Sequence, residues 1–447
     1  MKKTILIVFL TVMVGIGWFS FVSDAMKENN KMEQVEQLLA NADAFVEDGL
    51  YQRAIQNYKT VLEYNNTEEN WTKLMNAYEK RYAEDANILS DYIASLESAV
   101  EEYPKNRDFL VKLVDFYIMK NKYENVYNVL SRAETNGLTD DELMQKKLDA
   151  RYIYSEGNLN FDSFIGIVNG SYMITKDGKW GSLFADGSKD YTLKYEYLSP
   201  MSSDKTIVIT TEKDSRLTSN DGTTLGIFSF RVNEAGLLSQ GLIPVKDNNK
   251  YAYYNTFAQK QDIGEFEKAT TFVNGKAAVK NDGSWFLIDT SGEKVSDNFA
   301  DIVMANDECY FSNGVMIAAS EPGKYGFYDE ELNRIGDFTC ENIDISSNTS
   351  LIAFEQNGKW GFVDTKGNIV IEPQYESAKS FSYGLAAVCK DGKWGFINKD
   401  NRLVIKYQYT DADYFNNSGC CIVKTETVDA DGQTVVEFKL LKLKLGI

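Results

Sequence analysis

A unit of about 35 residues recurs through the second half of the chain and limits what this half can fold into. Its clearest copy carries two apolar stretches on either side of Asp391-Gly392, followed by Trp394-Gly395. Asp-Gly between alternating apolar residues is a strong signal for a β-hairpin, because a type I′ turn needs positive φ at both central positions. A second turn and a third apolar stretch follow, so each copy predicts a three-stranded antiparallel sheet.

One position marks each copy of the unit, and successive markers lie 34 to 40 residues apart. The markers are Trp180, Ser215, Tyr251, Trp285, Tyr325, Trp360 and Trp394, with glycine following at Gly181, Gly326, Gly361 and Gly395. A Trp ring offers a large apolar face for packing on the next hairpin, and glycine leaves room where another backbone comes close. We therefore expect these residues to form the repeat core; a ring of aromatics that stacks on sugars or peptides is the alternative.

This pattern resembles the bacterial WG-repeat family, whose hallmark is Trp-Gly within such a repeat. The resemblance covers residues 160–447 and implies a binding or structural module. One unit cannot hold a core alone, so we predict a closed β-propeller of seven or eight blades, with an open β-solenoid as the alternative. An eroded last copy would run from Cys421 to Leu445, and the strand at Phe164–Val168 is expected to pair with the C-terminal strand and close the ring.

Residues 30–155 show a helical period instead. Apolar residues recur at three- and four-residue steps from Val35 to Val46, and Gly49, Tyr51 and Ala54 then open a second helix. This arrangement resembles tetratricopeptide repeats, in two to three degenerate units. The resemblance implies a peptide-binding groove, and a rigid spacer is the other interpretation. The chain as a whole is therefore predicted to be multidomain, α followed by all-β.

Residues 1–25 contain an uncharged apolar run, 4–22, behind Lys2 and Lys3. Its length is near the roughly 20 residues that span a bilayer as a helix, and the lysines place the N-terminus in the cytoplasm. We predict a single-pass anchor in the cell membrane with the bulk of the chain extracytoplasmic. A signal peptide cleaved near Ala25, giving a secreted protein, is the alternative.

Composition narrows the possible functions. The chain has no histidine, which removes the usual general base and the commonest metal ligand. The net charge of −19 argues against binding nucleic acid. The five cysteines lack metal-ligand spacing and are expected to be small buried residues. Asp429-x-Asp431-Gly432 is interpreted as a hairpin turn and not as a calcium loop. We nominate no catalytic, metal-binding or cofactor-binding residue and expect no cofactor.

Together these features predict a non-catalytic scaffold at the bacterial cell surface that binds protein or peptide partners, or glycans, and touches the membrane through its N-terminal helix. A carboxylate-based hydrolase of the cell envelope is the alternative, and it predicts clustered acidic residues with raised pKa in the central channel. A sensor or assembly factor that holds a partner in its helical repeats is a third hypothesis.

Overall fold

The computed structural model describes residues 31–305, 309–346, 349 and 351–446, so the anchor predicted at residues 1–25 lies outside the described residues. The chain divides into two compact units, Met1–Arg151 and Tyr152–Ile447. Within the described ranges, no helix combines the length and the apolar character needed to cross a bilayer.

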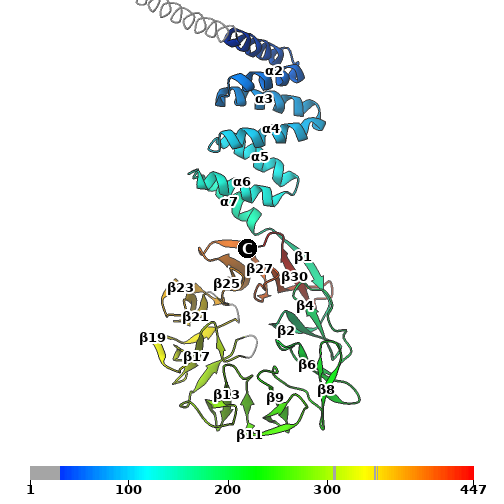
Figure 1. Ribbon diagram of the computed structural model, residues 1–447, viewed down its shortest axis with the longest axis vertical. Helices are drawn as coiled ribbons and strands as arrows, with labels where there is room; N and C mark the ends of the chain where they lie inside the picture. The colour runs from blue at the N-terminus through cyan, green and yellow to red at the C-terminus, as the bar shows by residue number, and fades with distance from the viewer. Residues whose placement is uncertain (1–30, 306–308, 347–348, 350, 447) are drawn as a thin grey trace, which may run out of the picture. The chain divides into compact units, whose positions relative to one another are not determined.

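The first unit consists of helices that pack against their neighbours in chain order (Figure 1). A helix over 31–47 is followed by α2 (Tyr51–Tyr64), α3 (Glu68–Glu84), the 3-10 turn η1 (Ala86–Ile88), α4 (Leu89–Glu102), α5 (Arg107–Met119), α6 (Tyr123–Thr135) and α7 (Asp141–Arg151). These are three helix pairs and a final helix, consistent with the expected tetratricopeptide-like region. The turn η1 lies between the two helices of the second pair.

Small side chains allow these helices to approach closely. Alanines at most 1% exposed occur throughout the helical core: Ala42, Ala54, Ala77, Ala99 and Ala133. Polar caps set the helix starts. The Thr67 hydroxyl accepts from the Asn70 N–H at 3.3 Å, and the side-chain oxygen of Asn106 accepts from the Phe109 N–H at 3.0 Å. Such caps satisfy backbone donors that the first helical turn leaves unpaired.

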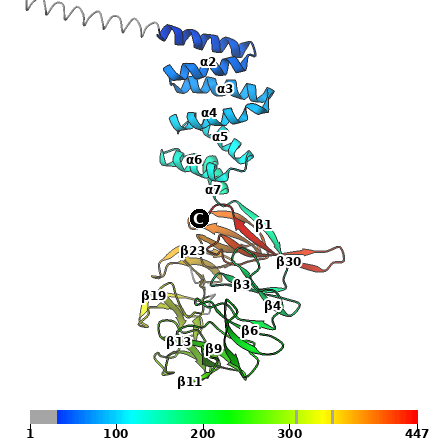
Figure 2. The same ribbon diagram turned by 45° about the vertical axis from the view of Figure 1, so that its right-hand side comes forward.

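The second unit is a β-propeller whose eight antiparallel sheets, within the described residues, form a ring (Figures 1 and 2). In chain order, blades 1 to 8 contain β2–β4 (Ser163–Val168, Ser171–Lys176, Lys179–Phe184); β5–β8 (Tyr197–Leu198, Thr206–Thr210, Ser215–Ser219, Thr224–Phe228); β9–β11 (Leu242–Asp247, Lys250–Asn255, Lys260–Phe266); β12–β14 (Lys268–Ala269, Lys276–Asn281, Ser284–Asp289); β15–β19 (Asp301–Val303, Phe311–Ser312, Val315–Ala319, Tyr325–Tyr328, Arg334–Cys340); β20–β23 (Asn342–Asp344, Ile352–Gln356, Lys359–Val363, Ile369–Tyr375); β24–β27 (Ser377–Ala378, Leu385–Lys390, Lys393–Asn398, Leu403–Tyr409); and β28–β30 (Asp411–Ala412, Cys420–Val428, Thr434–Leu443) with β1 (Tyr154–Leu159). The propeller prediction is confirmed with eight blades, and the open solenoid is wrong.

The ring closes through β1 and not through the segment Phe164–Val168, so that prediction is wrong. Residues 164–168 belong to β2, which pairs with β3 inside blade 1. In blade 8, β1 pairs with β30 over six residues, from Tyr154 opposite Leu443 to Leu159 opposite Phe438. The N-terminal strand of the propeller thus completes its last blade, which removes the free edge that β30 would otherwise expose.

The hairpin turns have the expected backbone. Asp391 and Gly392 have φ of 51° and 69°, and Asn357 and Gly358 have φ of 54° and 71°. Positive φ at both central residues is the requirement of a type I′ turn, whose twist matches that of the flanking strands.

The five cysteines carry free thiols in the described structure, and four of them are buried. Cys420 and Cys421 occupy successive positions of β29 and join different apolar clusters. They therefore act as small packing residues on opposite faces of the strand.

Candidate binding surfaces

Three of the four glycines after the marker residues, Gly181, Gly361 and Gly395, lie where another stretch of backbone comes close. An ideal Cβ on Gly361 would stand 2.5 Å from the carbonyl oxygen of Ile371, and one on Gly395 would stand 2.6 Å from that of Ile405. At Gly181 the nearest backbone oxygen would be 2.7 Å away, whereas Gly326 faces the side chain of Arg334. Glycine is therefore needed in these strands for close backbone packing.

The marker aromatics are buried or partly buried, and most belong to separate apolar clusters. Trp180 packs edge-on against Tyr197 of blade 2, with ring centroids 5.4 Å apart, and Trp360, Trp394 and Trp285 pack in other clusters. Tyr325 donates to Asp301 at 2.7 Å, and Tyr251 donates to Glu234. These positions contribute to packing within and between blades.

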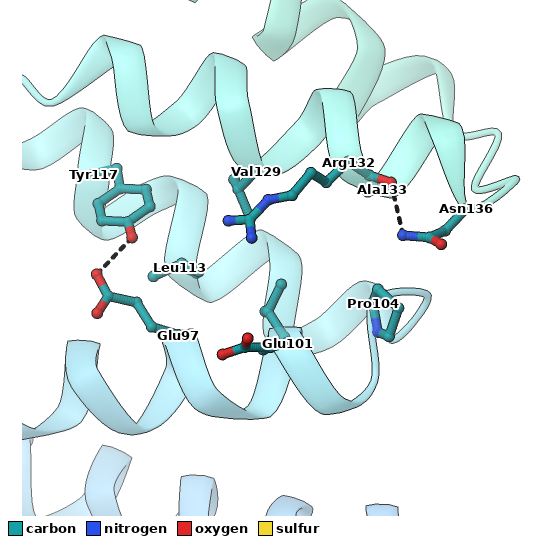
Figure 3. A pocket seen from close by; sticks show the side chains of 10 residues that line it. Glu97, Glu101, Pro104, Leu113, Tyr117, Val129, Arg132, Ala133 and Asn136 are labelled. Atoms are coloured by element: carbon teal, nitrogen blue, oxygen red, sulfur yellow. Dashed lines mark hydrogen bonds between the residues drawn. The ribbon is translucent and has the colours of Figure 1, made fainter.

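Helices α4, α5 and α6 enclose a pocket of about 510 Å³ (Figure 3). Its floor is apolar and buried, and it consists of Val100, Leu113, Val129 and Ala133. Polar side chains surround this floor: Glu97, Glu101, Tyr117, Arg132 and Asn136. An apolar floor with a few polar groups around it is the usual composition of a ligand pocket.

Some polar groups of this pocket already have hydrogen-bond or ion-pair partners in the structure, and others have no ion-pair partner among the described residues. Tyr117 donates to the Glu97 carboxylate at 2.6 Å, and burial raises the pKa of Tyr117 to about 12, so its hydroxyl keeps its proton at neutral pH. Among the described residues, neither the Arg132 guanidinium nor the Glu101 carboxylate has an ion-pair partner. A guanidinium offers a planar fork of donors to carboxylates and carbonyl oxygens.

A ladder of ion pairs connects alternate helices, namely the helix over 31–47, α3, α5 and α7. The pairs are Lys73–Asp43 at 2.8 Å, Lys112–Glu79 at 2.5 Å and Lys146–Asp115 at 2.7 Å. Part of this ladder borders a second hollow of about 530 Å³, lined by Lys73, Asn76, Glu79 and Lys80 among others. The ladder fixes neighbouring helices relative to one another beside an exposed polar surface.

In the propeller, three charged residues occupy equivalent places at the ends of consecutive inner strands. Asp344 ends β20, Lys379 follows β24, and Asp413 follows β28. Asp344 accepts from the Tyr414 hydroxyl at 2.5 Å and from the Ser380 N–H at 2.7 Å. Lys379 Nζ lies 3.8 Å from Asp413 Oδ1 and 5.3 Å from the centre of the Tyr414 ring. Blades 6, 7 and 8 thus bring one cation and two carboxylates together.

Burial dominates the electrostatics of this cluster. It raises the pKa of both Asp344 and Asp413, although nearby Lys379 and hydrogen bonds act in the opposite direction. Burial disfavours the charged form of Lys379 as well, but Asp413, Asp411 and Asp344 outweigh it and raise the pKa of the ammonium. Lys379 therefore stays charged at neutral pH. Within the described residues, no group of three or more potential ligands could hold a metal ion.

None of the residues of the helical pocket or of the inner cluster is predicted as a site residue from the sequence. A signal for the cluster did exist, because Asp344, Lys379 and Asp413 lie 35 and 34 residues apart, which is the repeat step. Alignment of the copies on their markers would have placed these charges at one structural position. The helical pocket has no comparable signal in the sequence. Its side chains come from three helices, α4, α5 and α6, and do not recur at a fixed spacing.

Comparison with solved structures found several propellers of low identity. BamB from Moraxella catarrhalis is 13% identical, with a TM-score of 0.43, 66% of this chain covered and 97% of that chain. Hsv2p from Kluyveromyces lactis is 8% identical, with a TM-score of 0.36 and coverage of 63% and 98%. The Pan2 WD40 domain from Neurospora crassa is 13% identical, with a TM-score of 0.28 and coverage of 57% and 90%. A comparison with curated proteins found no match.

The family comparison concerns the propeller unit alone. The model described as "WG containing repeat" matches residues 264–285, 360–394 and 394–426. The last two matches begin at the marker residues Trp360 and Trp394, and the first ends at Trp285. The WG-repeat model thus matches the chain at three places, all of them within the propeller unit.

Proposed function

We propose that the chain is a non-catalytic scaffold that binds protein or peptide partners, or glycans, outside the cytoplasm. Residues 1–25 would hold it in the cell membrane as a single-pass protein. The observation that carries the proposal is the pocket between α4, α5 and α6, where Arg132 and Glu101 have no ion-pair partner among the described residues above a buried apolar floor. A peptide supplies what such a pocket lacks, namely an apolar side chain together with carbonyl and amide groups.

The pocket can be tested by crosslinking in intact cells. A photo-crosslinking residue at Glu101, which lines the pocket, is combined with Arg132→Glu or with the control Lys120→Glu, at an exposed turn residue directly after α5 that does not line the pocket. We expect defined protein adducts that Arg132→Glu abolishes and Lys120→Glu preserves. Adducts that are equally strong in both variants would refute peptide capture at this pocket.

The membrane arrangement has a separate test. Labelling intact cells with a membrane-impermeant lysine reagent should modify the chain, and removing residues 1–25 should leave it without its anchor. Protection of every lysine in intact cells, with labelling after lysis, would contradict the extracytoplasmic location.

One observation favours the alternative function, a carboxylate-based hydrolase. Asp344 and Asp413 are clustered on inner strands and both have a raised pKa, the property expected of a carboxyl group that acts as a general acid. Assays of the purified chain against chromogenic glycosides distinguish the two functions. The scaffold proposal expects equal background rates for the wild type and Asp413→Asn. Turnover that Asp413→Asn abolishes would establish the hydrolase.

A further inference from the structure

We propose that a pocket where blade 8 meets blade 1 binds a small organic anion with an apolar body, and that Lys176 and Lys189 attract its charge. The pocket has a volume of about 450 Å³ and is lined by β3, β4, the end of β1 and the segment that follows β4. This inference goes beyond the scaffold proposal and does not depend on the helical pocket, because every lining residue belongs to the propeller unit.

The floor of this pocket is apolar. Phe161, Ile174 and Leu183 are buried and belong to the cluster in which blade 1 packs on β29 and β30. Leu159 and Leu193 are half-buried and pack against the same cluster. Pockets of this size that combine apolar walls with a few polar groups are typical of small-molecule sites. The floor therefore favours a ligand whose larger part is apolar.

The rim of the pocket is polar and open to solvent. Asn158, Asn160, Lys189 and Thr192 line the pocket and are exposed. Lys176 lines it as well and is half-buried, and its ammonium donates to the side-chain oxygen of Asn160. The polar groups of the pocket are therefore accessible to a ligand that arrives from solvent.

The charged side chains that line the pocket are lysines. No aspartate or glutamate among the described residues lines it, whereas the helical pocket includes Glu97 and Glu101. In the described structure the Lys189 ammonium has neither an ion-pair partner nor a hydrogen-bond acceptor, and Lys176 has an amide oxygen in place of a carboxylate. Ammonium groups attract anions and donate strong hydrogen bonds to them. In a chain with a net charge of −19, this rim favours an anion over a cation.

Carboxylates also lie close to the lining residues in the sequence, but they are already engaged. They are Asp162, Asp186 and Asp190, which accept hydrogen bonds from the Asp177 N–H, from Ser188, and from the hydroxyls of Ser171 and Ser182. Hydrogen bonds from Ser188 and, to a smaller degree, the charge of Lys442 hold the pKa of Asp186 below its ordinary value. The repulsion that these carboxylates exert on an anion is therefore reduced, while the Lys189 ammonium is left for a ligand.

A carboxylate or a phosphate on an apolar body meets both requirements. Its apolar body would lie on Phe161 and Leu183, and its anionic group would accept from Lys189 at the rim. A neutral apolar molecule would leave the ammonium without an acceptor, and an inorganic anion would leave the apolar floor uncovered. Hexanoate and hexyl phosphate carry the two head groups on the same body, so comparing them identifies the head group that the site prefers.

The exposed position of Lys189 allows substitutions that keep the fold. Lys189→Met removes the ammonium and keeps an unbranched side chain, and Lys189→Arg keeps the charge. The matched control is Lys194→Met, which is exposed in the same segment and does not line the pocket. Thr192→Trp is a second variant, which introduces a large ring at an exposed position of the rim.

The test is titration of the full-length chain in lipid nanodiscs, with empty nanodiscs as the blank, followed by saturation-transfer NMR and calorimetry. The probes are hexanoate and hexyl phosphate. Hexanol, hexylammonium and acetate are the control probes, which lack the charge, reverse it or lack the apolar body.

We expect hexanoate, hexyl phosphate or both to bind, and each control probe to bind at least about tenfold more weakly, since a hydrogen bond to a charged group contributes about this much. Lys189→Met and Thr192→Trp should each weaken binding by about tenfold for the same reason or because the ring fills the pocket. Lys194→Met and Lys189→Arg should leave binding unchanged.

Three results would overturn the inference. They are the absence of binding by both anions, binding of any control probe as tight as that of the anions, and anion binding that withstands both Lys189→Met and Thr192→Trp. Arg132→Glu serves to separate this inference from the scaffold proposal. It should abolish peptide capture and leave anion binding intact, so either site can fail alone.

Discussion

The Cα of Gly361 lies so close to the carbonyl oxygen of Ile371 that a Cβ atom would stand 2.5 Å away from it. Both residues belong to blade 6, where β22 and β23 pair with an irregular register between Trp360 and Phe362. We predict that Gly361→Ala lowers the free energy of unfolding of the propeller by about 1–3 kcal/mol, the usual cost of an overpacked core. Urea unfolding followed by Trp fluorescence measures this change.

The control for this prediction is Gly157→Ala, which adds the same methyl group where no atom lies within 4 Å. It should change stability by no more than about 0.5 kcal/mol, as is usual for surface substitutions. Equal unfolding midpoints for Gly361→Ala and the wild type would show that β22 and β23 can separate at no cost, and that the glycine has another role.

The propeller could be predicted because its local signals agree with its tertiary structure. Asp391-Gly392 specifies the turn, and the Trp and Gly that follow specify how each blade packs on its neighbours. The closing strand carries no such signal, since most of Tyr154–Leu159 is exposed and has no alternating apolar pattern. Its pairing with β30 depends on residues nearly 300 positions away, which the local sequence does not encode.

The candidate sites depend on tertiary structure even more. Arg132 is a candidate binding residue because helices α4 and α5 place Glu101 and Leu113 beside it in one pocket. An exposed arginine in a helix does not by itself predict a binding site. Asp413 has the same sequence appearance as any other acidic residue of this acidic chain. Its significance comes from burial and from the lack of a partner for Oδ2.

A second prediction concerns ring closure. Ser155 of β1 and Lys442 of β30 are direct cross-strand partners separated by 287 residues. A disulfide in the variant Ser155→Cys, Lys442→Cys should stabilise the propeller by up to about 5 kcal/mol, because it constrains a very long loop in the unfolded chain. The pair Ser163 and Thr175, 12 residues apart inside blade 1, is the control and should give up to about 3 kcal/mol. Urea unfolding of the oxidised and reduced forms of each variant measures how much each disulfide stabilises the propeller. A larger gain from the disulfide inside blade 1 than from the one between β1 and β30 would mean that the ring opens first at another place.

A third prediction concerns the ion-pair ladder of the helical unit. The triple variant of Lys73, Lys112 and Lys146 to Gln should lower the stability of this unit by about 1–2 kcal/mol, because partly exposed pairs contribute roughly 0.2–1 kcal/mol each. Salt screens such pairs, so the loss should shrink at high ionic strength. Helical circular dichroism during urea unfolding gives both quantities. Gln at the exposed Lys105, Lys120 and Lys122 is the matched control, and an equal loss there would exclude a specific effect of the ladder.

The last prediction follows from the raised pKa of Asp413, which burial causes against the attraction of Lys379. A carboxyl group whose pKa is higher in the folded state binds more protons there than in the unfolded chain. Its contribution to stability is therefore complete below its usual pKa of 3.8 and is lost as the pH rises through the raised value. Asp413→Asn removes this dependence, so the melting temperature of the variant relative to wild type should increase as the pH rises from the usual value towards neutrality.

The size of the effect is about 1.4 kcal/mol for each unit by which the two pKa values differ. Asp344, Asp411 and Lys379 surround the same carboxyl group, and Asp344 is raised in the same direction, so a weaker dependence of this sign should remain in Asp413→Asn. Asp431→Asn, in the exposed turn between β29 and β30, controls for the loss of one negative charge and should run parallel to the wild type. If the Asp413→Asn curve also runs parallel to the wild type, Asp413 is ionised in the folded protein as readily as in water. The carboxylate would then be solvated.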